Sequence, residues 1–308
     1  MSTNHMASLA ALKERMLPKQ TPARWQDLSV SYRESVKASK ALLRDTVGGA
    51  YALGFDRDRW ELMQPFIRHY TAVMYRGDYL YEAAQRQGSA TITDHSWRTE
   101  LEELVDSYGV LTPEVRAGLA DLERYFITEG RIVLGEVELS QRVIEDVLSI
   151  RSSDVFTLDR LLYLLSGQEV DEEYLAMLRP WTLLMELRVD IDDYAGDVAD
   201  DSFNTIRLFH RLHGPERALA EVEDFRRRWV RRCLDQLQGA RTSTLRKLLL
   251  SGLPDAGIDV LAPLARRLPR AVLLPLAKST AARSDIATAP LPALLPDPAA
   301  PRLLSVAG

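Results

Sequence analysis

The sequence predicts an all-α protein built as a single large helical bundle with a central cavity. Apolar residues recur three and four positions apart from residue 29 to residue 250, which is the period of amphipathic helices, and no segment alternates as a strand does. The composition agrees, because 46% of the 308 residues are hydrophobic, 27% are charged and only 16 are glycine. Long amphipathic helices bury their apolar stripes against one another, and a large bundle can enclose a cavity.

The same periodicity, interrupted at glycine and proline, gives the range of each expected helix. The helices are expected over residues 29–52, 57–86, 94–107, 113–149, 154–166, 171–198, 202–213 and 215–250. Nine of the fifteen prolines lie at or after Pro254, and proline cannot continue a helix. We therefore expect an N-terminal segment over 1–28, a helical domain over 29–285 and an extended or disordered tail over 286–308. Residues 261–278 are expected to form a packed helix, with a membrane-surface helix as the alternative.

Charge and cysteine content limit the classes of partner and compartment. The formal net charge of −5 argues against a nucleic-acid surface, which needs a basic footprint. Cys233 is the single cysteine, so the chain has neither a disulfide framework nor a thiolate zinc site. The N-terminus lacks the apolar core of a secretory signal, and no span is long enough to cross a bilayer. These features predict a cytoplasmic protein without stable membrane insertion.

The strongest functional signal is an acidic stretch inside the helix expected over 171–198. Seven acids and the single base Arg188 lie within residues 186–201. On a helix Asp193, Asp197 and Asp201 advance by only about 40° per step, so they share one face. Like charges at this spacing repel one another and need water or a cation to offset them. Carboxylates without histidine or cysteine favour a hard ion such as Mg²⁺, and a solvated acidic helix end is the alternative.

A second acidic face and a basic residue complete the pattern. Asp78 and Glu82 stand four residues apart in DYLYE, with Arg86 continuing the same face. A surface salt-bridge ladder would have the same spacing. Arg151 and Ser152 precede Asp193 by about forty residues, and a planar guanidinium can hold two diphosphate oxygens at once. A helix-end arginine beside an acid is the alternative for Arg151.

These three elements, in this order, resemble the class I isoprenoid synthases, which include terpene cyclases and prenyl diphosphate synthases. DYLYE resembles their first aspartate-rich motif, although Gly77 stands where some members have another acid. DYAGDVADD matches the spacing of the metal ligands in the cyclases' second motif, and RQG resembles the arginine-glycine step after the first. The sequence around residues 46–58 lacks the lysine and arginine signature of the elongating enzymes, and no Arg-Tyr pair is evident near the C-terminus.

The resemblance implies a fold of the isoprenoid-synthase type and a magnesium-dependent terpene synthase, a carbon-oxygen lyase acting on a linear prenyl diphosphate. Asp78, Glu82, Asp193, Asp197 and Asp201 would hold three Mg²⁺ ions. The metals and Arg151 would stabilise the departing diphosphate, and Asp193 and Arg151 would be catalytic. The resemblance also implies a homodimer. Substrate contacts are expected from Arg151, Ser152 and Arg86, and from the aromatic residues Tyr75, Tyr79, Phe156, Trp181 and Tyr194, whose ring faces can stabilise a carbocation.

Two alternatives remain from the residues alone. A prenyltransferase that joins an allylic diphosphate to a second acceptor would use the same acids. A noncatalytic helical binding protein would instead dock through the basic run Arg226–Arg232, although such a run is more often a solvated helix face.

Overall fold

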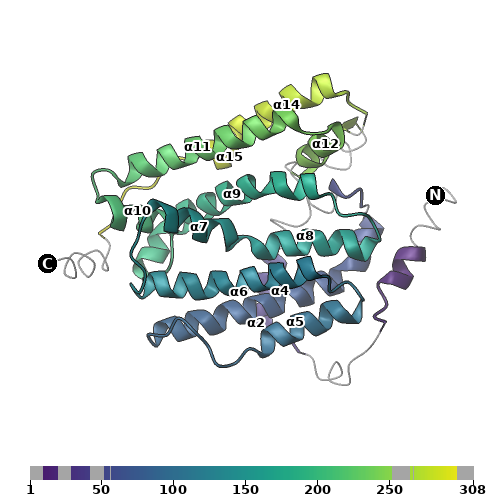
Figure 1. Cartoon of the computed structure of the whole chain (residues 1–308), viewed down its shortest axis with the longest axis horizontal. Coiled ribbons are helices and arrows are strands. Elements are labelled where there is room, and N and C mark those ends of the chain that lie inside the picture. The colour runs from purple at the N-terminus through teal and green to yellow at the C-terminus, as the bar shows by residue number, and fades with distance from the viewer. Residues whose placement is uncertain are drawn as a thin grey trace.

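The computed structural model describes residues 10–19, 29–41, 52–55, 57–251, 264–265 and 267–296, and these residues contain no β-strand. The prediction of an all-helical protein is therefore confirmed for the described residues (Figure 1). The helices are α2 (Tyr32–Ala41), α4 (Arg57–Arg86), α5 (Ser96–Ser107), α6 (Pro113–Val133), α7 (Gln141–Arg151), α8 (Ser153–Ser166), α9 (Glu172–Ala199), α10 (Thr205–His213), α11 (Ala218–Gly239), α12 (Thr242–Ser251), α14 (Arg270–Arg283) and α15 (Asp285–Thr288).

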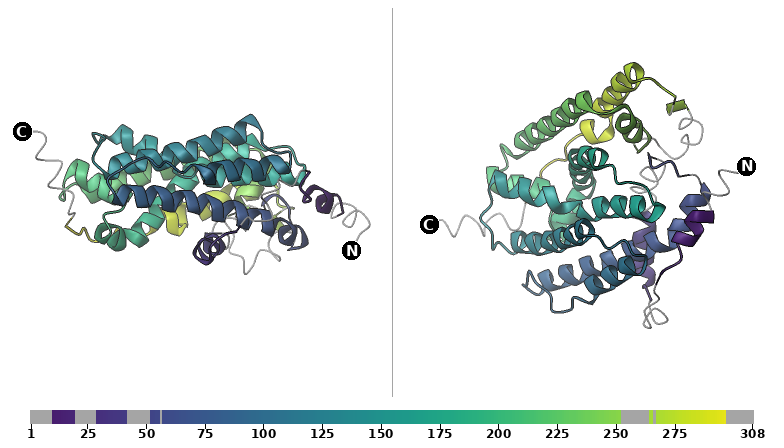
Figure 2. Two further views of the ribbon diagram at one scale, coloured as in Figure 1. Left: turned by 90° about the horizontal axis from the view of Figure 1, so that it is seen from below. Right: turned by 45° about the vertical axis from the view of Figure 1, so that its right-hand side comes forward.

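The helices pack in a slab, which Figure 2 shows from below and Figure 1 shows face-on. At one end α4 contacts α2, α5 and α6. In the middle α6 packs on α7 and α8, and α9 contacts both of these as well as α10. At the other end α11 and α12 pack between α9 and α14. The two helices that carry the acidic faces, α4 and α9, are thus linked through α6 and α7.

An aromatic cluster holds α4, α5 and α6 together. Tyr81, Trp97 and Phe126 come from these three helices, with ring centroids 5.3 to 6.5 Å apart. Trp97 is fully buried, and its indole lies against Gly77, where an added Cβ would come within 2.6 Å of the ring. Burial of such large side chains supplies much of the stabilisation of this end of the bundle. Gly77 is therefore required by packing.

Two of the expected helices are each divided in the structure. The expected helix over 113–149 is two helices, because α6 ends before Gly135, whose φ of 72° suits glycine. Ser140 then starts α7, and its hydroxyl accepts from the backbone N–H of Val143 at 3.2 Å. The expected helix over 215–250 is divided at Ala240, whose ψ of 142° is extended. The range of α4 agrees with the expectation at both ends.

The segments at the two ends of the chain also differ from the expectation. Residues 10–15 are helical and bury Leu12, although residues 1–28 were assigned to a separate segment. At the other end residues 286–288 belong to the short α15, residues 289–296 are not helical, and 297–308 lie outside the described residues. Of the packed helix expected over 261–278, residues 270–278 belong to α14, which buries Leu273, Ala277 and Ala281; residues 267–269 are not helical, and 261–263 and 266 lie outside the described residues. Part of the expected helix over 29–52 also lies outside the described residues.

Within the described parts of the chain, no helix combines the length and apolar character that crossing a bilayer requires.

Candidate functional site

Arg151, the last residue of α7, is held in a buried ion pair with α9. Its Nη1 and Nη2 donate to the two carboxylate oxygens of Asp190 at 2.8 and 2.9 Å, and its Nε lies 3.2 Å from Oε2 of Glu186. Asp190 is 1% exposed and also accepts from the backbone N–H of Thr205 at 2.9 Å. Burial lowers the pKa of Arg151, but the charges of Asp190, Tyr125 and Glu186 and the hydrogen bonds to Asp190 together outweigh it and hold the pKa well above its usual value. The guanidinium is therefore a fixed positive charge.

Ser152 supports the same cluster without facing an open space. It is 2% exposed, and its hydroxyl donates to Oε1 of Glu186 at 3.1 Å. It is also the single residue between α7 and α8. Ser152 therefore positions Glu186, and through it Arg151.

The acids of α9 separate into different environments. Asp193 is exposed, whereas Asp197 is half-buried and accepts from Nδ2 of Asn204 at 2.8 Å. Burial, together with the charges of Asp190 and Asp193, raises the pKa of Asp197 to about 6. Asn204 also caps α10, since its Oδ1 accepts from the backbone N–H of Ile206.

Asp201 does not share the helical face of Asp193 and Asp197. The helix α9 ends at Ala199, and Asp201 has a φ of 53°, outside the helical region. Its carboxylate pairs instead with Arg207 at 2.5 Å and with Arg211 at 3.2 Å. The expectation that three aspartates continue one helical face thus reduces to the pair Asp193 and Asp197.

The acidic pair of α4 faces α2. Asp78 accepts from Nζ of Lys37 at 2.7 Å, and the same ammonium lies 4.3 and 4.7 Å from the ring centroids of Tyr75 and Tyr79. Burial and the neighbouring Asp78 raise the pKa of Glu82. Lys37 thus neutralises the charge of Asp78. The rings of Tyr75 and Tyr79 contact the ammonium group of Lys37, which is a cation of the protein itself.

Arg86 and Gly77 account for two features of the α4 motif. The Arg86 side chain is 67% exposed, and its nearest approach to Glu82 is 3.8 Å, so it lies at the surface. Gly77 stands where some members of the resembled family have another acid, and the indole of Trp97 occupies the space that such a side chain would need. Packing therefore limits this motif to two acids.

Glu129 of α6 is influenced by the acids of α4 and by Arg151, and the sequence did not predict it as a site residue. Burial and the charges of Asp78 and Glu82 raise its pKa to about 7, against the opposing effects of a hydrogen bond with Tyr125 and of the charge of Arg151. The charges of both α4 acids and of Arg151 therefore act on one half-buried carboxyl. Its position in the sequence carried a signal, because it continues the apolar period of α6.

The described residues fit a divalent cation only in part. The donors are hard carboxylate oxygens, and several have raised pKa values that a bound cation would lower. No group of three or more acid, histidine or cysteine side chains that could hold a metal occurs among the described residues. Mg²⁺ commonly takes one or two protein carboxylates and completes its shell with water and substrate phosphates. The two pairs, Asp78 with Glu82 and Asp193 with Asp197, suit that mode.

An apolar cavity lies on another side of α9. It has a volume of about 240 Å³ between α8, α9, α12 and α14, and it includes Trp181. Of the other aromatic candidates, Phe156 packs under the guanidinium of Arg179 at 4.7 Å, and Tyr194 is buried, its hydroxyl accepting from the backbone N–H of Leu295. The cavity residues of α9 stand about a quarter of a turn from Asp193 and Asp197. The sequence led us to expect a cavity that contains these acids. Neither Asp193 nor Asp197 lines the apolar cavity formed by the described residues.

The basic run on α11 is not a continuous exposed surface. Arg226 is buried and donates to the backbone carbonyl of Ala289 and to Glu223. Arg227 pairs with Asp224. This segment therefore supports the packing of α11 against the residues that follow α15.

Comparisons with known proteins give no match. No family model, no curated protein and no solved structure is similar to the chain.

Proposed function

We propose that the chain is a magnesium-dependent terpene synthase of class I type, which binds a linear prenyl diphosphate and ionises its allylic C–O bond. The observation that supports the proposal is that the charges of the α4 acids and of Arg151 both act on the carboxyl of Glu129, while Arg151 also acts on Asp197 of α9. Two acid pairs and one buried arginine, if they face a common region, would suit a polyanion accompanied by cations.

The acid pairs would hold the metal, and the arginine would hold the diphosphate. Asp78 and Glu82 on α4, with Asp193 and Asp197 on α9, are the metal-binding residues of this proposal. When bound, Mg²⁺ would supply positive charge that stabilises the departing diphosphate. Asp193 is exposed and Asp197 half-buried, so both remain accessible to an incoming cation.

Arg151 is suited to hold a diphosphate because two of its five N–H groups remain outside its ion pairs. Nη1 and Nη2 each use one hydrogen on Asp190, and Nε is directed at Glu186. Asp190 and Ser152 act as positioning residues, since the first orients the guanidinium and the second orients Glu186. A preorganised cation of this kind stabilises developing negative charge without moving.

The test measures release of inorganic diphosphate and formation of organic product from linear C10, C15 and C20 prenyl diphosphates with Mg²⁺. Asp193→Asn is expected to lower turnover at least roughly 100-fold, because it removes a charged ligand of the proposed metal site. Asp192→Asn is the matched control, since Asp192 is the adjacent exposed aspartate and pairs with Arg188 on the surface. The proposal fails if no substrate of the series releases diphosphate, or if both variants behave alike. Release only after a second acceptor is added would instead indicate a prenyltransferase.

A further inference from the structure

Asp159 is a buried carboxyl that the proposed function does not use. It lies on α8, is 7% exposed and lines the apolar cavity between α8, α9, α12 and α14. Among the described residues no hydrogen bond or ion pair reaches its carboxyl, and burial alone raises its pKa to about 7. A buried carboxyl without a partner is costly, so it requires an explanation.

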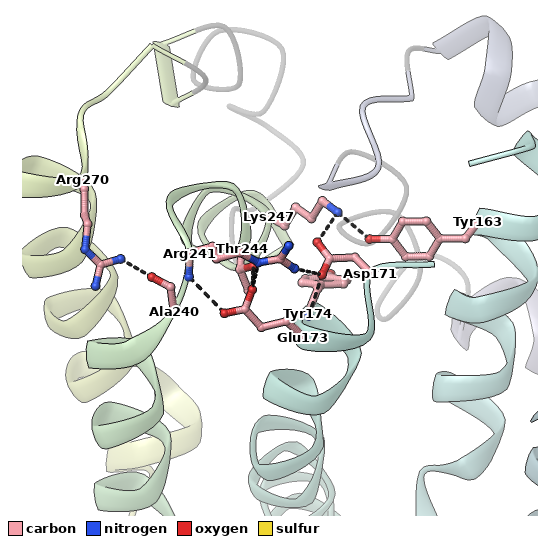
Figure 3. A network of polar contacts seen from close by, with 9 residues as sticks. All are labelled: Tyr163, Asp171, Glu173, Tyr174, Ala240, Arg241, Thr244, Lys247 and Arg270. Atoms are coloured by element: carbon pink, nitrogen blue, oxygen red, sulfur yellow. Dashed lines mark hydrogen bonds and ion pairs between the residues drawn. The ribbon is translucent and has the colours of Figure 1, made fainter. Parts of the chain in front are cut away.

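Lys247, which precedes the cavity residue Leu248, already has an acidic partner. Lys247 of α12 donates to the hydroxyl of Tyr163 at 2.8 Å and to the carboxylate of Asp171 at 2.7 Å. Figure 3 shows this network, in which Arg241 also pairs with Asp171 at 2.8 Å. The network fastens α12 to α8 and to the start of α9. It holds the cavity wall in place and leaves Asp159 without a cation of its own.

The remaining wall of the cavity is mainly apolar and partly aromatic, with the hydroxyl-bearing residues Tyr174, Thr182, Thr280 and Ser284 as its other polar members. Leu178, Trp181 and Met185 line it from α9, Leu248 and Leu249 line it from α12, and Ala277 and Ala281 line it from α14. A dry cavity of about 150 Å³ accepts benzene, so about 240 Å³ corresponds to a ligand of roughly ten non-hydrogen atoms. The ring of Trp181 offers an additional favourable surface to a cation.

We propose that this cavity binds a small hydrophobic amine, whose ammonium group pairs with the carboxylate of Asp159 while its hydrocarbon body fills the apolar wall. Charge complementarity selects the amine, because a lone carboxylate in an apolar cavity gains more from a cation than from a neutral group. The site is separate from the acid pairs around Arg151, and its occupancy does not depend on the proposed enzymatic activity.

The test compares ligands of one size that differ in one group. Isothermal titration calorimetry on the full chain at pH 8 would measure binding of 2-phenylethylamine, with n-propylbenzene as the uncharged match and 2-phenylethanol as the neutral polar match. The amine is expected to bind roughly tenfold or more tightly than either match. The inference is overturned if the amine shows no such preference, or if no ligand binds.

Two variants separate the charge from the cavity. Asp159→Asn keeps the shape and is expected to remove the preference for the amine while n-propylbenzene still binds. Ala281→Leu fills the cavity and is expected to abolish binding of all three ligands, with its fold verified by circular dichroism. Retention of the amine preference in Asp159→Asn would assign the binding to another site and overturn the inference, as would unchanged binding in a folded Ala281→Leu variant.

Discussion

The ion pair between Arg151 and Asp190 gives the sharpest test of how the site is held together. In Arg151→Met the carboxylate of Asp190 would remain at 1% exposure with one donor left, the backbone N–H of Thr205. Two charge-assisted hydrogen bonds at 2.8 and 2.9 Å would be lost. Removal of one partner from a buried pair typically costs about 3–5 kcal/mol, and the retained N–H places the expectation near about 3 kcal/mol.

A double-mutant cycle then measures the coupling itself. In Arg151→Met/Asp190→Asn the amide oxygen can still accept from Thr205, and no uncompensated charge remains at position 190, while the loss of the contact with Glu186 is common to the single and the double variant. We therefore expect the double variant to be more stable than the sum of the single changes predicts, by at least about 2 kcal/mol. Urea unfolding followed by circular dichroism at pH 7 supplies the free energies.

The control cycle uses Arg142→Met and Asp146→Asn. This pair has the same residue types on α7, but its side chains are 90% and 72% exposed and its charges are 3.6 Å apart. Its coupling should be within about 0.5 kcal/mol of zero. If the Arg151 variant loses less than about 1 kcal/mol, or the two single effects simply add, then the pair is not the buried anchor described above.

Two further expectations concern packing and pH. Gly77→Ala should destabilise the chain by about 1–3 kcal/mol, because the new Cβ would come within 2.6 Å of Trp97. The control Gly196→Ala in α9 has nothing within 4 Å of its new Cβ and should stabilise the chain by up to about 1 kcal/mol. Equal thermal unfolding midpoints for the two variants would contradict this expectation. Asp159 has a folded-state pKa of about 7 against an ordinary 3.8, so ionisation of the unfolded chain lowers stability as the pH rises from 4 to 7, by at most about 4 kcal/mol. Asp159→Asn removes this loss, so its advantage over the parent chain should be larger at pH 8 than at pH 4, and a pH-independent difference in urea midpoint would refute the assignment.

The spacing of apolar residues predicted a helix correctly where a single apolar stripe corresponds to a single helix. The range of α4 could be predicted because its pattern begins and ends together with its helix. The breaks at Gly135 and Ala240 were missed because apolar residues continue at helical spacing on both sides of each break. At such breaks the backbone conformation of the turn residue determines where one helix ends, and a single glycine or alanine in the sequence is a weak indicator of a helix end.

The site was less predictable because its pairings join distant parts of the chain. Extension of the α9 pattern to Asp201 failed, since the helix ends at Ala199 and Arg207 engages the carboxylate. No local pattern could indicate that Asp190, rather than another acid of the same stretch, is the partner of Arg151. Glu129 and Asp159 were within reach, because each places a carboxyl at an apolar position of its helix.

The contact between Gly77 and Trp97 also restricts the order in which substitutions can accumulate. A third acid in the α4 motif could enter only after the indole at position 97 had been replaced by a smaller side chain, because either change alone would leave a clash or a void. The two positions are therefore expected to vary together among descendants of this sequence, with residue 97 changing first.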